Sequence, residues 1–197
     1  IVSSIITIAV YLFLRRKNIK KDYIYRCISI VVAIILVIIS TYLISYTYDL
    51  TADGNYYHKV AIGILNEGWN PTRQSSLDYI KDNNPEMADE KMCLWIDHYP
   101  KATWNFAASI YSITGDIESG KVIVFLTMIS VACLVFAYLS KRHLKIWQSA
   151  IVSILLVVNP IICAQMFSYY VDGIMGLYIY AIILFLIMIT DKKFDYI

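Results

Sequence analysis

Charged residues are scarce in this 197-residue sequence: Asp, Glu, Lys and Arg make up 16%, whereas soluble domains of similar size carry about a quarter. Hydrophobic residues make up 59%, and they form long runs instead of being scattered at helical spacing. Such runs exclude a soluble core protein and indicate a chain that resides in a lipid bilayer.

Signatures of several function classes are missing. The net charge of +2 comes with no basic stripe interleaved with aromatic residues, so we expect no nucleic-acid partner. The four cysteines form no CxxC pair, and the three histidines form no HxH or HxxxH pair. These absences argue against a disulfide framework and a metal centre. No Walker motif, GxSxG elbow or dinucleotide fingerprint occurs.

Five hydrophobic runs stand out, and most of them approach the length that a hydrocarbon core of roughly 30 Å requires. They are Ile1–Leu14, Cys27–Tyr48, Val122–Ser140, Ile146–Ile162 and Ile174–Thr190. The sequence therefore predicts an all-α, polytopic integral membrane protein with about five transmembrane helices. Because the chain starts without methionine inside one run and ends just after another, we expect a single membrane domain, residues 1–197, from the N-terminal part of a longer protein.

The distribution of basic residues predicts the orientation. Eleven of the seventeen Lys and Arg residues lie in the short loops after the first, third and fifth runs. The stretch Asp49–Lys121 and the link near Asp172 together hold six basic and twelve acidic residues. Because short basic loops stay in the cytoplasm, we expect a multi-pass protein of the plasma (inner) membrane, with the loop 49–121 on the extracytoplasmic side.

The long loop carries signals for short helices. Asp53 is a predicted N-cap for a helix over Gly54–Asn66. A second short helix is predicted over Ser75–Lys81, and an aromatic-rich amphipathic helix over Trp104–Ile113 that ends at Gly115. Short helices rich in Trp and Tyr beside a membrane are expected to lie at its interface.

The first candidate cluster for chemistry follows the second run directly and contains Asp49 and Asp53. A carboxylate held at the membrane face is suited to act as a general base, because partial burial makes it more basic. Four residues apart, the two carboxylates would share one face of a helix. The alternative is that Asp53 only caps a helix and Asp49 is only solvated.

The second cluster surrounds Pro100. His98 and Asp97 are candidates to bind a metal together with Asp53, or to bind a phosphate together with Lys101. The alternative is a proline turn that opens an interfacial helix with aromatic anchors.

The third cluster follows Asn159 and ends in Asp172, at the mouth of two predicted spans. A lone carboxylate in this place is a candidate functional group. The alternative is an ordinary loop residue.

Taken in order, these clusters resemble the motifs of GT-C-type membrane glycosyltransferases, in particular the branch with protein O-mannosyltransferases and lipid A aminoarabinose transferases. That branch carries Asp-Glu-x-x-Tyr after an early span, then His-x-Pro opening a helix, then Gly and Glu before the next span. The matching positions are Asp53-Gly-Asn-Tyr56-Tyr57, His98-Tyr99-Pro100-Lys101, and Gly115-Asp116-Ile117-Glu118 followed by Lys121. Here Gly54 replaces the Glu, and Tyr99 stands at the first Pro of the usual His-Pro-Pro. The resemblance covers about residues 27–173.

This resemblance implies a sugar donor linked to polyprenyl phosphate, an acceptor of unknown identity, and inversion at the anomeric carbon. Asp53 would deprotonate or orient the acceptor, and a cation would stabilise the leaving phosphate, Lys101 first, with Arg73 and Lys59 behind it. The expected catalytic residues are Asp53, Asp49 and Asp172, and the expected substrate-binding residues are Tyr57, His58, His98, Lys101 and Arg73. Donors of this kind demand no metal, so neither a metal nor a cofactor is expected.

Two other classes remain open. A transporter or flippase would be expected to carry charges or broken helices within its spans. A non-catalytic component of polysaccharide export would need no base at all. The five runs are almost free of internal charge, and the polar residues gather in the long loop, which favours chemistry at the membrane interface.

Overall fold

The computed structural model describes residues 19–142 and 144–191, and the predicted first span, Ile1–Leu14, lies outside them. Within the described residues all regular structure is helical, with nine α-helices. Three segments are long and apolar enough to cross a membrane: Cys27–Ser45, Ile117–Ser140 and Asp172–Thr190. The chain is therefore all-α, and these segments indicate a multi-pass membrane protein.

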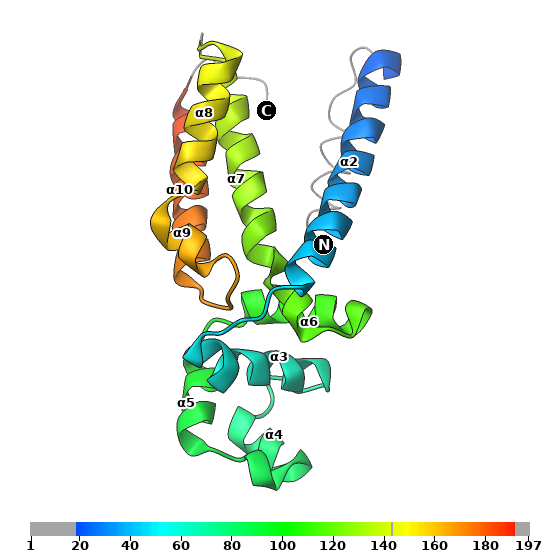
Figure 1. Ribbon diagram of the computed structural model, residues 1–197, viewed down its shortest axis with the longest axis vertical. Helices are drawn as coiled ribbons and strands as arrows, with labels where there is room; N and C mark the ends of the chain where they lie inside the picture. The colour runs from blue at the N-terminus through cyan, green and yellow to red at the C-terminus, as the bar shows by residue number, and fades with distance from the viewer. Residues whose placement is uncertain (1–18, 143, 192–197) are drawn as a thin grey trace. The chain divides into compact units, whose positions relative to one another are not determined.

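The helices appear in chain order in Figure 1. They are α2 (Ile19–Ser45), α3 (Lys59–Asn66), α4 (Ser76–Asn83), α5 (Glu90–His98), α6 (Ala102–Thr114), α7 (Val122–Ser140), α8 (Ile146–Val157), α9 (Pro160–Gln165) and α10 (Asp172–Thr190). A π-helical turn, Gly54–His58, leads into α3, and 3-10 turns over Pro85–Met87 and Ile117–Lys121 precede α5 and α7. The chain divides into two compact units, Ile1–Ile39 and Ser40–Ile197.

The first unit contributes the greater part of α2. Its side chains from Cys27 to Ile39 are apolar or small, and all of them are exposed. This composition suits a membrane-spanning helix, because apolar surface needs no cover in a bilayer. The helix ends at Ser45, three residues before the predicted end of the second span.

In the second unit, α7, α8 and α10 lie side by side (Figure 1). Four of the five buried residues of α7 recur every three or four positions, which places them on one face of the helix. They are Val124, Met128, Val131 and Val135, and they share one cluster with Leu177 and Leu184 of α10. Helices are thus confirmed for the third and fifth predicted spans.

The fourth predicted span is not one continuous helix. α8 ends at Val157, Val158 has a non-helical backbone, and Asn159 starts α9 by accepting a hydrogen bond from the Ile162 amide. Pro160 is the cause, because proline lacks an N–H and restricts the residue before it. The predicted fourth span, about Ile146–Ile162, is therefore divided between the 12-residue helix α8 and the start of the short helix α9.

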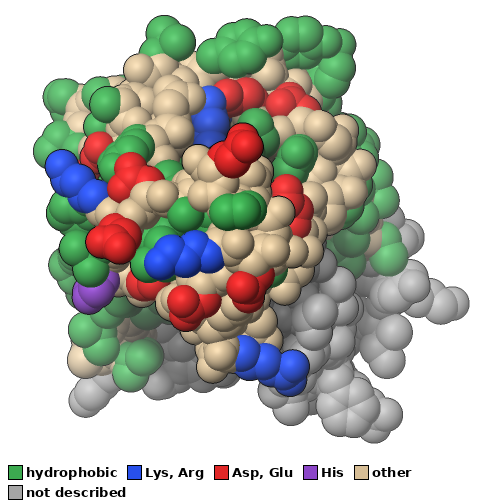
Figure 2. Space-filling view, turned by 90° about the horizontal axis from the view of Figure 1, so that it is seen from below, with side chains coloured by type: hydrophobic (Ala, Val, Ile, Leu, Met, Phe, Trp, Pro, Cys, Tyr) green, Lys and Arg blue, Asp and Glu red, His purple; other side chains and the backbone are tan. Residues whose placement is uncertain are grey.

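The region between α2 and α7 folds around an aromatic core. Its largest buried side chain is Trp104, which packs in one cluster with Tyr57, Trp69 and Ile96. On the face where α4 and α5 lie, acidic and basic side chains are interspersed among hydrophobic ones (Figure 2). The region is thus built like a small water-facing domain, with apolar residues inside and charges outside.

Most of the predicted helix ends in this region are confirmed. The Ser75 hydroxyl caps α4 by accepting from the Asp78 amide. α6 ends at Gly115, whose φ of 70° is the left-handed conformation that glycine adopts readily. At the end of α3, Gly68 has a φ of 108°, and the Trp69 amide donates to the Ile64 carbonyl at 2.8 Å.

Candidate functional site

The helix that carries Asp53 begins at Thr51. The Thr51 hydroxyl oxygen accepts from the Gly54 amide at 3.1 Å, which is an N-cap hydrogen bond. Asp53 already has helical backbone angles, φ −66° and ψ −38°, and its side chain makes no capping bond. The prediction that Asp53 is the N-cap is therefore wrong, and its carboxylate remains available for another role.

The Asp53 carboxylate is half-buried and faces one aromatic hydroxyl. Tyr57, one turn later, donates from its hydroxyl to Asp53 Oδ2 at 3.3 Å. Burial raises the pKa of Tyr57 far above its ordinary value, so this hydroxyl keeps its proton and acts as a donor. Among the described residues no other side chain bonds this carboxylate, which leaves it acceptor capacity for a substrate proton.

Asp49 lies in a different environment, since only 2% of its surface is exposed. Its Oδ1 accepts from the Thr51 amide at 2.9 Å and from the Thr51 hydroxyl at 2.6 Å. Its Oδ2 accepts from the Tyr169 amide at 2.8 Å. Both carboxylate oxygens are therefore bonded inside the protein.

A buried ion network lies beside Asp49. Glu118 pairs with both Lys59 and Lys121, with 2.6 Å between Lys121 Nζ and Glu118 Oε2, and it also accepts from the Asp49 amide at 3.1 Å. Lys121 is fully buried and donates to the Thr47 carbonyl as well. Two carboxylates and two ammonium groups balance in charge, as buried charges must to avoid a large desolvation cost. The network joins the segment after α2 to the starts of α3 and α7.

His58 lies at the centre of the site and is completely buried. The Trp104 indole N–H donates to its Nδ1 at 2.9 Å, so the neutral ring carries its proton on Nε2. Burial lowers the pKa of His58 to about 4, although three nearby carboxylates act in the opposite direction. Those carboxylates belong to Asp53, Asp49 and Asp172, which are the three predicted catalytic residues. His58 Nε2 has no hydrogen-bond partner among the described residues.

Aromatic rings enclose this imidazole. The ring centroids of Tyr57 and His58 are 4.3 Å apart, and the Tyr170 ring lies edge-on to His58 at 6.3 Å. Tyr99 stacks on Trp104 with 5.9 Å between centroids and 17° between planes. The structure therefore brings together the predicted residues Asp49, Asp53, Tyr57, His58 and Asp172 around one aromatic cluster.

The other predicted residues lie apart from this cluster. His98 is exposed, and its Nδ1 bonds a carbonyl oxygen one turn earlier at 2.8 Å. The Lys101 ammonium donates to three backbone carbonyls at the end of α5, at 2.6, 2.7 and 2.6 Å. Arg73 is exposed and lines, together with Lys101, an open groove of about 580 Å³.

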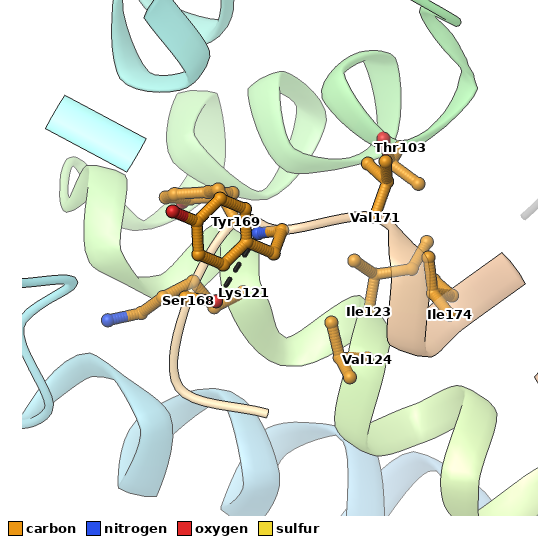
Figure 3. A pocket seen from close by; sticks show the side chains of 9 residues that line it. Thr103, Lys121, Ile123, Val124, Ser168, Tyr169, Val171 and Ile174 are labelled. Carbon is orange, nitrogen blue, oxygen red and sulfur yellow. Dashed lines mark hydrogen bonds between the residues drawn. The ribbon is translucent and has the colours of Figure 1, made fainter. Parts of the chain in front are cut away.

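A small cavity adjoins the site between α6, the start of α7 and the turn before α10 (Figure 3). Thr103, Lys121, Tyr170 and Ile174 are among its lining residues. Its volume of about 10 Å³ is about the room that one water molecule needs. The Thr103 hydroxyl is buried and has no partner among the described residues, so the cavity suits one ordered water and no larger ligand.

Sequence reasoning gave no role to Thr51, Glu118, Lys121 or Trp104. Glu118 and Lys121 carried the one usable signal, because they stand three residues apart directly before an apolar run. Charged groups at the head of an apolar helix are partly buried, so each of them needs a partner of opposite charge. Comparisons with protein-family models, with curated proteins and with solved structures found no match, so the site rests on its geometry.

Proposed function

We propose that this protein is a membrane glycosyltransferase, which moves a sugar from a polyprenyl-phosphate carrier to an acceptor at the outer face of the membrane. The observation that carries the proposal is the Asp53 carboxylate, which is half-buried, free of any capping bond, and set beside a cluster of aromatic rings. It stands eight residues after the end of the membrane helix α2. In this proposal the chain has five spans with GT-C-like topology, and the loop 49–121 is extracytoplasmic.

Asp53 acts in this mechanism as the general base. It takes the proton of the acceptor hydroxyl or amine while that group attacks the anomeric carbon from the face opposite the phosphate. The bond between the anomeric carbon and the phosphate oxygen breaks, the lipid phosphate leaves with the electron pair, and the configuration inverts. The Tyr57 hydroxyl orients the carboxylate by donating to Oδ2, and Asp172 is the second acidic group of the site.

The leaving phosphate needs a cation near the membrane face. Lys101 would have to release a backbone carbonyl in order to bind it. Lys59 also donates three bonds, to Glu118, Asn55 and the Asp49 carbonyl. It differs from Lys101 because Glu118 joins it to the head of the membrane segment Ile117–Ser140, and 17% of its side chain stays exposed. The proposal therefore gives the phosphate first to Lys59, with Arg73 and Lys101 as further contacts to the donor.

Purified full-length protein in proteoliposomes, tested with a panel of polyprenyl-phosphate sugars, provides the assay. Asp53→Asn should lower the transfer rate by about 100-fold or more, since removal of a positioned base costs about 10²–10⁴. The structure gives no capping bond to lose, so the stability of the variant should match the wild type. The matched control is Glu86→Gln, which neutralises an exposed carboxylate of the same loop. Wild-type turnover in Asp53→Asn would rule out the mechanism.

A transporter or flippase is the second candidate, and one observation favours it. The break between α8 and α9 interrupts an apolar run, as in transporters whose discontinuous helices bind substrate within the membrane. A labelled lipid-linked sugar would then cross the vesicle membrane without transfer of its sugar to an acceptor. Movement of this kind that is unaffected by Asp53→Asn would support a transporter or flippase instead.

A further inference from the structure

One buried carboxylate connects two segments that are far apart in the sequence. Asp49 Oδ1 bonds Thr51, two residues away, and Asp49 Oδ2 accepts from the Tyr169 amide, 120 residues away. The two bonds have ordinary lengths of 2.9 and 2.8 Å, and the carboxylate is almost completely enclosed. Asp49 thus fixes the start of one helix against the turn that leads into another.

Each of the two segments carries part of the candidate site. Thr51 caps the helix start on which Asp53 lies two residues later. Tyr169 begins the turn that contains Tyr170, which faces His58, and it leads to Asp172 at the first position of α10. The position of one candidate carboxylate relative to the other therefore depends on Asp49.

Gly54 shows how closely the chain packs around this carboxylate. A Cβ atom at this position would lie 2.1 Å from Asp49 Oδ2 and 2.5 Å from the Thr51 hydroxyl oxygen. Only glycine leaves room for the carboxylate in its present place.

We propose that Asp49 is a positioning residue for the reaction, which holds Asp53 and Asp172 in register and does not touch the substrate. The proposal rests on the proposed function. It replaces a catalytic role for Asp49 with a geometric one, because a carboxylate that is 2% exposed and bonded at both oxygens has no atom to offer a substrate.

The Asp49 carboxylate forms a bridge between Thr51 and the Tyr169 amide. Asp49→Asn tests this bridge with little change in the shape of the side chain. An amide oxygen keeps the bonds from Thr51, whereas the amide nitrogen brings a donor against the Tyr169 N–H and cannot accept from it. We expect kcat to fall by about 10²-fold, the usual cost of a misplacement of about 1 Å. KM should change little, and the pH profile should keep its shape, because Asp53 remains the base.

Gly54→Ala provides an independent route to the same defect, because its methyl group pushes the Asp49 carboxylate away. The double variant, Gly54→Ala with Asp49→Asn, should lose little more than either single variant, since both changes break one bridge. Gly63→Ala is the matched control: a Cβ there meets nothing within 4 Å, and we expect wild-type kcat. Thermal unfolding of each variant in detergent establishes that it is folded.

Hydrogen exchange measured by mass spectrometry tests the bridge without any assay of activity. The peptide that contains Tyr169 should exchange faster in Asp49→Asn and in Gly54→Ala than in the wild type and the Gly63→Ala control.

Three outcomes would each overturn the proposal: unchanged exchange in both Asp49→Asn and Gly54→Ala, additive losses of kcat in the double variant, or loss of the acidic limb of the pH profile in Asp49→Asn. An inactive Asp53→Asn beside a fully active Asp49→Asn would remove the positioning role alone, whereas a fully active Asp53→Asn would remove the proposed function.

Discussion

The loop region, residues 46–121, and the helical bundle of α7, α8 and α10 both bury aliphatic side chains, but they differ in what else they bury. The loop core contains large aromatic rings such as Trp104 and Tyr57, and it also encloses paired charges. The bundle core contains aliphatic side chains and the small residues Ser149 and Ser153. Its outer surface is as apolar as its core, with Leu155 67% exposed.

This difference follows from the two solvents. Around the loop, water drives apolar groups inward and demands a partner for each buried charge. In a bilayer, apolar surface gains nothing from burial, so helices associate through close packing, which small residues permit. The charges of the bundle accordingly gather at its ends, with Glu118 and Lys121 at one end and the pair of Arg142 and Asp191 at the other.

The largest expected effect concerns the side of the membrane on which each region lies. In a background without the four native cysteines, single cysteines replace Asp78 in α4 and Lys141 after α7, which are both exposed. An impermeant maleimide applied to intact cells should label position 78 and leave position 141 unlabelled, because short basic loops stay inside. Both should react after permeabilisation. Labelling of position 141 in intact cells would reverse the orientation.

A buried imidazole should make the loop sensitive to acid. The pKa of His58 is lowered by burial from 6.5 to about 4, so the unfolded chain binds a proton at a higher pH than the folded chain. Stability is therefore fully present above pH 6.5 and falls towards pH 4, by about 3 kcal/mol in total. Denaturant titrations in detergent at several pH values measure this loss.

His58→Asn serves as the control for this prediction. The Asn side chain offers an oxygen near the place of Nδ1, so Trp104 keeps an acceptor, while the titrating group is gone. The variant should therefore lose less stability than the wild type between pH 6.5 and pH 4. An identical pH dependence in the two proteins would show that other groups account for the loss.

A smaller effect is expected from overpacking in the bundle. Ser153 of α8 is 2% exposed, and its replacement by Leu forces extra atoms into a close helix contact. We expect Ser153→Leu to destabilise the protein by about 1–3 kcal/mol, as overpacked cores do. Ile154→Leu, at a position that is 56% exposed, is the matched control and should be neutral. Equal stability of both variants in detergent unfolding would mean that α8 is not closely packed there.

The helix ends show how far sequence patterns reach. Gly115 ends its helix as predicted, because a cap depends on groups within one turn of the helix. Asp53 does not act as predicted, although its residue type suits a cap. Thr51, two residues earlier, takes that role because its hydroxyl is held by Asp49, which is itself held by the distant Tyr169 amide.

The candidate site divides in the same way. Asp49, Asp53 and His58 follow one another closely in the sequence, and their shared position could be predicted. The differences in burial and hydrogen bonding among these side chains could not be predicted, because they depend on Tyr169 for Asp49 and on Trp104 for His58. Lys101 stands beside a recognisable motif, yet its ammonium donates to backbone carbonyls at the end of α5. This contact could not be predicted, because it depends on where the chain runs after that helix.

The sequence by itself determined that the chain is helical, that it has long segments apolar enough to cross a membrane, and where most of the helices end. Hydropathy acts on each segment separately, and backbone hydrogen bonds in a helix reach only four residues, so local composition suffices for these features. The tertiary structure alone decided which carboxylate is enclosed and which stays available, and which lysine is paired. Burial and pairing depend on groups from distant segments, and the energy of a charge depends on what replaces its water.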